Sequence, residues 1–344
     1  MMNRSDVIVI GAGPIGLETA AAIVRTGRTV VVVDSGPIGA TIASQFPPAT
    51  RFFSSPDRLE IAGFSISDPG QEKLSREQFL TYLRNVVTTL DLDVKTFHHV
   101  ERITRQDDCF EVQLTARSGK TVHMESSTLV LATGGTGRVR TLGIPGEALP
   151  HVRHDLGDPH QYHGRSVLIV GGRNSACESA LRCWRAGATV HLSYRGSDLH
   201  DRVKYWIRPE LAALIEEGHV HGHFGTELVE ITDSTATLGR TSDGQRISIE
   251  ADDILLQIGY EQNRDLLEAA GVACSDPEGT PTFDPKTMET DSPGVYVAGT
   301  ATAGTQERFR VFIENCHVHA DRIAAAIAGQ QPPEERSRRT LEEN

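Results

Sequence analysis

A glycine-rich turn that follows a short apolar run constrains the fold of this chain more than any other feature. Residues 6–10 (DVIVI) are apolar almost throughout, as in a strand that is covered on both faces of a parallel sheet. Residues 11–16 (GAGPIG) follow at once and match G-x-G-x-x-G, whose glycines permit the tight turn, the approach of a pyrophosphate and the helix contact. A helix pattern over 15–26 and an apolar run over 29–33 complete a β-α-β unit.

The residue that ends the second apolar run indicates what this unit binds. Asp34 lies 23 positions after Gly11, where a carboxylate accepts a hydrogen bond from the 2'-hydroxyl of an adenosine ribose. Amide groups at the start of the helix supply donors for phosphates. The alternative is a purely structural glycine turn. We predict a dinucleotide site that includes Gly11, Gly13, Pro14, Ile15, Gly16 and Asp34.

The same pattern recurs in the middle of the chain. An apolar run over 166–170 (SVLIV) leads into 171–176 (GGRNSA), then a helix to about residue 186 and a strand over 189–194. The third position of this second turn, usually glycine, is an arginine that could contact phosphate. We predict a second dinucleotide site that includes Gly171, Gly172, Arg173, Asn174, Ser175 and Ala176.

The residues after the second unit favour NADPH over NADH. No carboxylate ends the strand, and Tyr194 and Arg195 are followed by Arg202 and Lys204, which suit a 2'-phosphate. The alternative is an ordinary solvated basic loop. Tyr194, Arg195 and Lys204 are therefore candidate NADPH ligands.

The remaining elements define an α/β chain with two Rossmann-type dinucleotide-binding domains. Polar alternation over 94–131 predicts a small antiparallel excursion, 129–135 reads as a buried strand entering a glycine turn, and 294–299 reads as another. A final helix is predicted near 312–328. We predict an FAD-binding domain from residues 1–150 with 261–329, an NADPH-binding domain from residues 151–260, and a disordered, charged tail from residues 330–344.

Composition excludes several classes of partner and compartment. Acidic residues outnumber basic ones by 46 to 34, and the net charge of -12 disfavours nucleic acid and anionic membrane surfaces. The chain has no apolar run of membrane-spanning length and no signal-peptide core, which indicates the cytoplasm. Its five cysteines form no C-x-x-C pair and read as reduced, packed thiols.

The order of these elements resembles low-molecular-weight thioredoxin reductase, with Ala132-Thr133-Gly134 before the inserted domain and Gly299 after it. The missing C-x-x-C excludes the dithiol mechanism of that enzyme. Several blocks within residues 7–328 are more specific: FFSSPDRLEI (52–61), PGE (145–147) with Pro150-His151, GGRNSA (171–176), YRG (194–196), Lys204 with Trp206 and Pro209, and FIEN (312–315). Together they resemble the bacillithiol disulfide reductase family.

This resemblance implies an FAD-dependent NADPH oxidoreductase of redox homeostasis, a homodimer that reduces a low-molecular-weight disulfide such as bacillithiol disulfide. The family carries a cysteine where this chain has Ile15, and isoleucine cannot exchange with a disulfide. In the wider reductase pattern an aspartate occupies the position that Thr300 has in this chain. The hydroxyl of Thr300 can still donate a hydrogen bond. The resemblance adds these cofactor-binding residues: Phe53, Ser54, Ala132, Thr133, Gly134, Gly259, Gly299, Thr300 and Asn315.

The electron acceptor stays open among three hypotheses. In the first hypothesis, reduced flavin, or a cysteine outside the usual loop, reduces a small disulfide. Alternatively, electrons pass to ferredoxin or another redox protein, or to oxygen as in a flavin monooxygenase. The third hypothesis is a flavin redox sensor without turnover.

Other candidate residues have less specific patterns, and no catalytic residue is assigned. Cys177 and Cys316 are candidate redox thiols, with a packed thiol as the alternative for each. His317 and His319 are candidate proton donors or packing residues. The alternation of residues 219–223 (HVHGH) fits a solvated edge strand better than a metal site, so we predict no metal.

Overall fold

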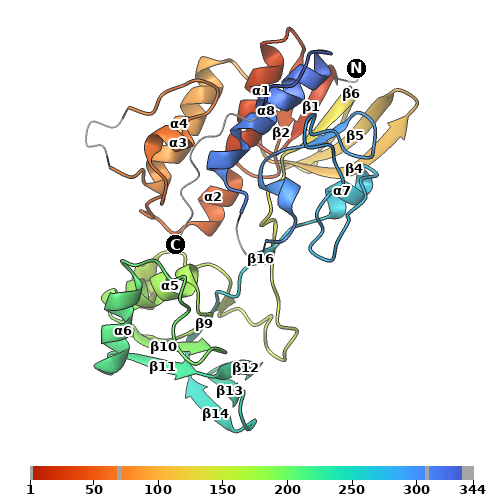
Figure 1. The fold of residues 1–344 in the computed structure, drawn as a ribbon. Coiled ribbons are helices and arrows are strands. Elements are labelled where there is room, and N and C mark those ends of the chain that lie inside the picture. The colour runs from red at the N-terminus through yellow and green to blue at the C-terminus, as the bar shows by residue number, and fades with distance from the viewer. Residues whose placement is uncertain (1–2, 68–71, 307–309, 335–344) are drawn as a thin grey trace. The chain divides into compact units, whose positions relative to one another are not determined.

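The chain forms two compact units, which are described separately (Figure 1). The structure, a computed structural model, describes residues 3–67, 72–306 and 310–334. One unit combines the chain up to Arg138 with the chain from Tyr260 on, and the other spans Val139–Gly259. Of the tail predicted to be disordered, residues 335–344 lie outside the described residues.

The first unit is built on a mixed sheet in the order β3-β2-β1-β6-β5-β4, with β17 also paired to β6. The strands β3, β2, β1, β6 and β17 run parallel, whereas β4, β5 and β6 form an antiparallel meander. The strands are β1 (Asn3–Ile10), β2 (Val30–Val33), β3 (Val94–Lys95), β4 (His98–Gln106), β5 (Cys109–Ala116), β6 (Thr121–Leu131) and β17 (Val295–Val297). The helices are α1 (Pro14–Val24), α2 (Ala40–Gln45), α3 (Pro56–Leu59), α4 (Arg76–Thr89), α7 (Asp265–Ala269), the 3-10 turn η2 (Gly299–Ala303) and α8 (Ile313–Ile327).

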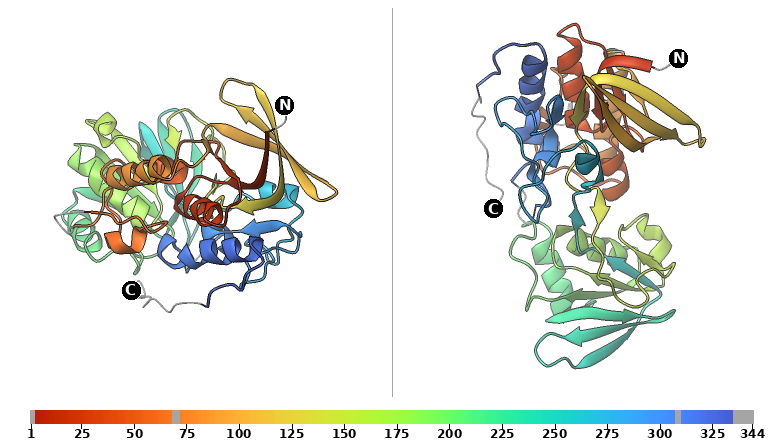
Figure 2. Two further views of the ribbon diagram at one scale, coloured as in Figure 1. Left: turned by 90° about the horizontal axis from the view of Figure 1, so that it is seen from above. Right: turned by 90° about the vertical axis from the view of Figure 1, so that its right-hand side faces the viewer.

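The parallel part of this sheet is buried on both faces, which explains the nearly continuous apolar sequence of β1, β2 and the end of β6. Along β1, Val7 and Val9 pack into one cluster with α1, α4 and α8, whereas Ile8 and Ile10 pack into a second cluster with β5 and α7. The helices α1 and α8 lie side by side on the first face, although one begins at residue 14 and the other at residue 313 (Figure 2).

The second unit repeats this arrangement with a parallel sheet in the order β11-β10-β9-β15-β8. On β9, Val167 and Ile169 face the helices, while Leu168 and Val170 face an antiparallel sheet of β12, β13 and β14. The elements are β8 (Val152–Arg153), η1 (Pro159–Tyr162), β9 (Ser166–Val170), α5 (Asn174–Arg185), β10 (Thr189–Tyr194), α6 (Arg208–Glu216), β11 (Val220–Phe224), β12 (Thr226–Ile231), β13 (Thr235–Arg240), β14 (Arg246–Glu250) and β15 (Asp253–Leu256). Two further short strands, β7 (Arg138–Val139) and β16 (Tyr260–Glu261), pair with each other in the connecting segments.

The α/β fold with two Rossmann-type units is confirmed, as are both β-α-β units and the return of residues 295–297 to the first sheet. The first helix ends at Val24 rather than residue 26, because Gly27 adopts φ +84 in the turn that follows. The antiparallel excursion is confirmed for β4, β5 and β6, but the prediction was wrong for β3, which pairs in parallel with β2. The edge position of β11 is confirmed.

Candidate functional site

The first glycine loop is closed against β6 and open at its centre. A Cβ on Gly11 would lie 2.3 Å from the carbonyl oxygen of Ala132, and one on Gly16 would lie 2.0 Å from the carbonyl oxygen of Gly11. A Cβ on Gly13 would meet nothing within 4 Å, and α1 begins at the next residue, Pro14. The loop therefore leaves an open cradle beside the unpaired amide groups of the first helical turn, which suits a pyrophosphate.

Asp34 is fixed beside this loop by two backbone amides. Its carboxylate accepts hydrogen bonds from the nitrogen of Ala12 at 2.7 Å and from the nitrogen of Gly36 at 2.8 Å. Burial raises the pKa of this carboxyl, and the two hydrogen bonds partly oppose that shift. The side chain is thus held rigidly at the end of β2, where it can accept a ribose hydroxyl.

Three segments far apart in the sequence meet at the carboxyl ends of parallel strands. Ile10, Leu131 and Val297 are neighbours across β1, β6 and β17, so the glycine turn that follows each strand reaches the same edge of the sheet. The hydroxyl of Thr300 accepts a hydrogen bond from the nitrogen of Gly135 at 3.0 Å, and its proton stays available to a further acceptor. Also present at this edge are Ala132, Thr133, Gly134 and Gly299, which the sequence predicted to bind the cofactor.

Ile15 is buried against the turn that follows β17. Its side chain is 6% exposed, and a Cβ on Gly299 would lie 3.2 Å from the Cβ of Ile15. Gly299 adopts φ +70, which a residue with a side chain rarely tolerates. This position of the loop is therefore a packing contact between α1 and η2.

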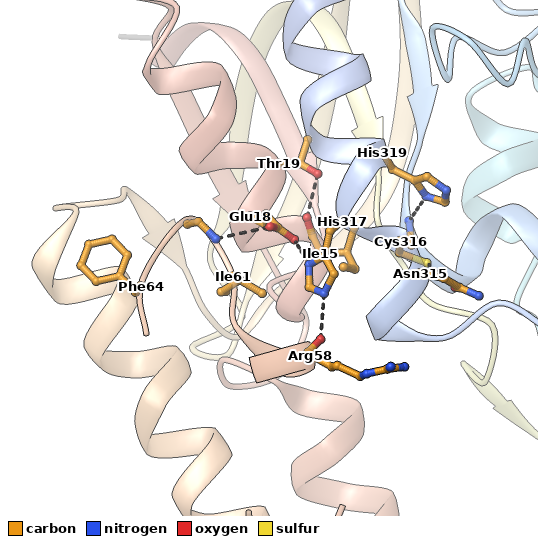
Figure 3. Close-up of polar contacts among 12 residues, drawn as sticks. Ile15, Glu18, Thr19, Arg58, Ile61, Phe64, Asn315, Cys316, His317 and His319 are labelled. Atoms are coloured by element: carbon orange, nitrogen blue, oxygen red, sulfur yellow. Dashed lines mark hydrogen bonds and ion pairs between the residues drawn. The ribbon is translucent and has the colours of Figure 1, made fainter. Parts of the chain in front are cut away.

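A polar pair lies one helical turn beyond Ile15 (Figure 3). Nδ1 of His317 lies 2.7 Å from a carboxylate oxygen of Glu18, and Nε2 of His317 lies 2.9 Å from the carbonyl oxygen of Arg58. The second carboxylate oxygen of Glu18 accepts a hydrogen bond from the nitrogen of Ala62 at 3.3 Å. The pair therefore joins α1 and α8 to α3 and to the segment that follows it.

The partners of this histidine favour a protonated ring. Both ring nitrogens of His317 face oxygen atoms, and with Glu18 ionised both carry a hydrogen, so this arrangement favours the cationic imidazole. The side chains of His317 and Glu18 are only 12% and 14% exposed. Glu18 thus compensates a positive charge that is largely removed from water.

His319 has the opposite protonation state. Its Nδ1 accepts a hydrogen bond from the nitrogen of Gly299 at 3.2 Å, so the proton of the neutral ring is on Nε2. Burial, together with the charge of Arg322 and of His317, lowers the pKa of His319 to about 4. This histidine therefore supports the turn after β17 as a neutral acceptor and is poorly suited to donating a proton from a charged state.

The segment before α3 carries two of the predicted cofactor residues. The hydroxyl of Ser54 donates to the carboxylate of Glu314 in the first turn of α8. The ring of Phe53 is 37% exposed and lies 4.3 Å from Nζ of Lys73. Asn315 accepts a hydrogen bond from the nitrogen of Phe312 at 2.8 Å and so holds the start of α8.

The second glycine loop has the same backbone design as the first. The nitrogen of Gly11 donates to the carbonyl oxygen of Val33 at 2.8 Å. In the second loop, the nitrogen of Gly171 donates to the carbonyl oxygen of Ser193 at 2.9 Å. Tyr194 therefore occupies in the second unit the position that Asp34 occupies in the first. A Cβ on Gly172 would lie 2.4 Å from the Tyr194 ring, so this ring covers the loop where the first unit has a carboxylate.

Basic groups gather around the second loop. Arg173 and Arg195 are exposed at the amino end of α5 and after β10. The nitrogen of Lys204 donates to the side-chain oxygen of Asn174 at 2.8 Å, which attaches the basic loop to the first residue of α5. The predicted residues Ser175 and Ala176 begin this helix, exposed and fully buried respectively, and Gly259 adopts φ +96 at the end of the unit.

None of the five cysteines is arranged as a reactive thiol. Cys177, Cys183 and Cys316 are fully buried, and burial raises the pKa of Cys177 and Cys183 to about 12. Burial and the nearby charges of Glu314 and Glu18 raise the pKa of Cys316 further. Cys274 also has a raised pKa, and Cys109 lies partly exposed on β5. All five are free thiols, and the geometry argues against a redox role for Cys177 or Cys316.

The histidines of β10 and β11 pack on one another. Nδ1 of His191 lies 3.0 Å from Nε2 of His223, and the ring of His191 stacks on that of His221 with centroids 4.7 Å apart. Burial and the two neighbouring rings lower the pKa of His191 to about 4. Within the described ranges, no group of three His, Cys, Asp or Glu side chains could hold a metal ion. Among residues 3–67, 72–306 and 310–334, no helix is long and apolar enough to cross a membrane.

The sequence analysis missed Glu18, which joins two helices that are distant in sequence. The available signal was a single acidic residue in a helix whose other described side chains are apolar or small, PIGLETAAAIV. An acidic residue on such a helix requires a partner, but only the tertiary structure identifies it as His317.

The chain matches a family model over most of its length. Residues 8–299 match the model described as pyridine nucleotide-disulphide oxidoreductase. A curated relative, bacilliredoxin reductase Bdr of Bacillus subtilis, is 32% identical over 331 residues, covering 96% of this chain and 99% of that protein. A ferredoxin–NADP reductase of Ignicoccus hospitalis is 25% identical over 304 residues, covering 86% of this chain and 90% of that protein.

Solved structures show the same arrangement of elements. The bacillithiol disulfide reductase Bdr of Bacillus cereus superimposes with a TM-score of 0.89 at 34% identity, covering 95% of this chain and 99% of that one. The thioredoxin reductase of T. acidophilum superimposes with a TM-score of 0.72 at 18% identity, covering 95% and 98%, a likeness of fold alone. The predicted resemblance to these reductases is confirmed.

Proposed function

The chain belongs to the pyridine nucleotide-disulphide oxidoreductase family, and from this premise we propose that it is an FAD-dependent oxidoreductase that uses NADPH to reduce a low-molecular-weight disulfide. The observation that carries this proposal is the pair of glycine loops, each at the carboxyl edge of its own parallel sheet. Two such loops supply sites for two dinucleotides, as electron transfer from NADPH to a flavin requires.

The first unit holds FAD in this proposal. The open cradle at Gly13 and the start of α1 receive the pyrophosphate, and Asp34 accepts the ribose hydroxyl. The hydroxyl of Thr300, which is positioned by Gly135, takes the role of a donor to the ribityl chain. FAD held by these residues would supply the chemistry of hydride acceptance from NADPH and of two-electron delivery to the acceptor.

The second unit holds NADPH. Tyr194 replaces the carboxylate that would bind a 2'-hydroxyl and repel a 2'-phosphate. Arg195, Lys204 and Arg173 supply positive charge around that phosphate. The amide groups at the start of α5 face the pyrophosphate.

The substrate class follows from the relatives and from the chemistry of this chain. The proteins similar over nearly the whole chain are named bacilliredoxin reductase and bacillithiol disulfide reductase. We therefore propose a bacillithiol-type disulfide as the substrate. Its reduction takes up two electrons and two protons, breaks the S–S bond and releases two thiols. Ile15 occupies the loop position and Cys177, Cys183 and Cys316 are buried, so in this proposal the electrons reach the disulfide from the reduced flavin without exchange at these thiols.

The absence of a suitable thiol favours one alternative acceptor. A ferredoxin-type protein accepts electrons from a flavin without thiol exchange, and the similarity to a ferredoxin–NADP reductase is compatible with this. The finer proposals are a homodimer, as in the related reductases, and a cytoplasmic location, where free cysteines such as these five persist.

Anaerobic titration with NADPH tests the proposal. The flavin absorbance of the purified protein should bleach, and a panel of bacillithiol disulfide, other disulfides, ferredoxin and oxygen should identify what restores it. Recovery with bacillithiol disulfide supports the reductase, and recovery with ferredoxin alone supports the alternative. A flavin that NADPH does not bleach would contradict both and leave the sensor hypothesis.

Two variants separate the cofactor from the substrate. Asp34→Ala should weaken FAD binding at least tenfold, because it removes the acceptor at the ribose and releases two backbone amides. Ile15→Cys places a thiol at the position where related reductases carry one. A gain of disulfide turnover in Ile15→Cys would show that the scaffold is suited to thiol exchange and that the natural chain lacks only the thiol for it.

A further inference from the structure

An exposed aromatic and basic segment follows the second glycine loop in sequence. Tyr205 is 81% exposed and Trp206 is 42% exposed, both unusually high for large aromatic side chains. Their rings meet edge to face with centroids 4.8 Å apart at an interplanar angle of 89°. Nζ of Lys204 lies 5.2 Å from the centroid of the Trp206 ring.

The start of this segment is attached to the dinucleotide loop. The backbone nitrogen of Lys204 is bound to the side chain of Asn174, the first residue of α5, at 2.8 Å. The segment also belongs to the loop that leaves β10, the strand whose end faces the adenosine half of a dinucleotide in this fold. Tyr205 and Trp206 therefore follow directly on a residue held at the start of α5, within the loop that leaves the adenosine-side strand β10.

The other aromatic ring near this loop, Tyr194, is only partly exposed and packs against two glycines. A Cβ on Gly172 would lie 2.4 Å from the Tyr194 ring, and one on Gly196 would lie 2.5 Å from it. The Tyr194 ring thus packs against the backbone of both glycines. Trp206 carries the ammonium of Lys204 over its ring, which leaves Tyr205 as the ring with most of its surface uncovered.

We propose that Tyr205 is the stacking surface for the adenine ring of the pyridine nucleotide, with Trp206 fixing the direction of the Tyr205 ring by their edge-to-face contact. The inference rests on the proposed use of NADPH and names a subsite within it. Stacking of a nucleobase on an exposed aromatic ring contributes enough to change affinity about tenfold. Lys204 and the exposed Arg202, next to this ring in sequence, complement the phosphate groups of the same half of the nucleotide.

Binding of adenosine 2',5'-bisphosphate to the full-length flavoprotein tests this subsite. Tyr205→Ala should raise the dissociation constant of this probe about tenfold in calorimetry. Tyr205→Phe is the matched control, because phenylalanine keeps the stacking face and should stay within about twofold of the natural protein. The dissociation constant of the probe for Trp206→Ala should lie between those for Tyr205→Ala and Tyr205→Phe.

The tryptophans give an independent readout. The chain has two, so Trp184→Phe leaves Trp206 as the sole tryptophan. The probe should change its fluorescence in that variant, and Tyr205→Ala added to it should shift the titration to about tenfold higher concentration.

Reduced nicotinamide mononucleotide, which lacks the adenosine half, separates this inference from the proposed function. It should bleach the flavin at the same rate in Tyr205→Ala and in the natural protein. Equal affinity of both proteins for adenosine 2',5'-bisphosphate would overturn the stacking role, even while NADPH still bleaches the flavin. A flavin that neither nicotinamide compound bleaches would overturn the proposed function instead.

Discussion

Nδ1 of His317 lies 2.7 Å from the carboxylate of Glu18, so an imidazolium and a carboxylate meet between two helices that begin at residues 14 and 313. The same imidazolium holds the carbonyl oxygen of Arg58, and the same carboxylate holds the nitrogen of Ala62. The pair thereby fastens the segment after α3 to the helix that follows the first glycine loop.

Removal of one partner of this pair should destabilise the protein strongly. Glu18→Ala leaves a mostly desolvated cation without compensation and should cost about 2–4 kcal/mol of unfolding free energy in urea denaturation. The control is His123→Gln at the exposed pair between His123 and Glu111, 2.9 Å apart, which should cost less than about 1 kcal/mol. Equal effects of the two substitutions would contradict the buried, charged state of His317.

The contact between Gly299 and Ile15 should make the turn after β17 intolerant of a side chain. Gly299→Ala should cost about 2–3 kcal/mol, because it adds a clash with Ile15 to the strain of φ +70. Gly119→Ala is the control for backbone strain alone, because Gly119 has φ +83 and a Cβ added there would meet nothing within 4 Å. Ile15→Ala should rescue Gly299→Ala only in part. Equal unfolding free energies for the two glycine variants would show that the contact is unimportant.

His319 should make stability depend on pH below neutrality. With a pKa of about 4 in the folded protein and about 6.5 in the unfolded chain, the unfolded state binds more protons between these values. Stability should therefore fall as pH falls from 6.5 to 4, by up to about 3 kcal/mol from this residue. Urea unfolding at several pH values should show a shallower fall in His319→Gln. An identical slope in both proteins would be inconsistent with a buried, neutral His319.

Arg195 should contribute to the preference for NADPH. Arg195→Gln removes an exposed charge at the 2'-phosphate position that we propose and should raise KM for NADPH about tenfold while leaving KM for NADH nearly unchanged. Steady-state kinetics with both coenzymes measures this, and rising salt should reduce the difference. A proportional loss with NADH would place Arg195 outside the 2'-phosphate site.

The buried thiols should resist alkylation while the protein stays active. Iodoacetamide at pH 7.5 should modify the partly exposed Cys109 and Cys274 and spare Cys177, Cys183 and Cys316. Mass spectrometry of the native protein locates the adducts, and NADPH should still bleach the flavin of the modified sample. Rapid alkylation of Cys316 with loss of disulfide turnover would instead identify a reactive thiol.

The sequence by itself determined the two β-α-β units and the kind of ligand that each can bind. Local patterns carry this information, since an apolar run such as 166–170 followed at once by a glycine turn and a helix pattern is typical of a strand in a covered parallel sheet. The glycines at 11 and 171 likewise mark turns whose close contacts exclude a Cβ. Spacing along the chain was also enough to show that the second strand of the first unit is followed by the carboxylate of Asp34, whereas the corresponding strand of the second unit ends at Tyr194.

Only the tertiary structure decided which side chains meet across long stretches of sequence. The charge of His317 depends on acceptors contributed by Glu18 and Arg58, which lie 299 and 259 positions away. The inertness of Cys316 likewise follows from packing that no local pattern encodes. The physical reason is that protonation and thiol reactivity are set by solvation and by neighbouring charges, and both arise only when distant elements pack together.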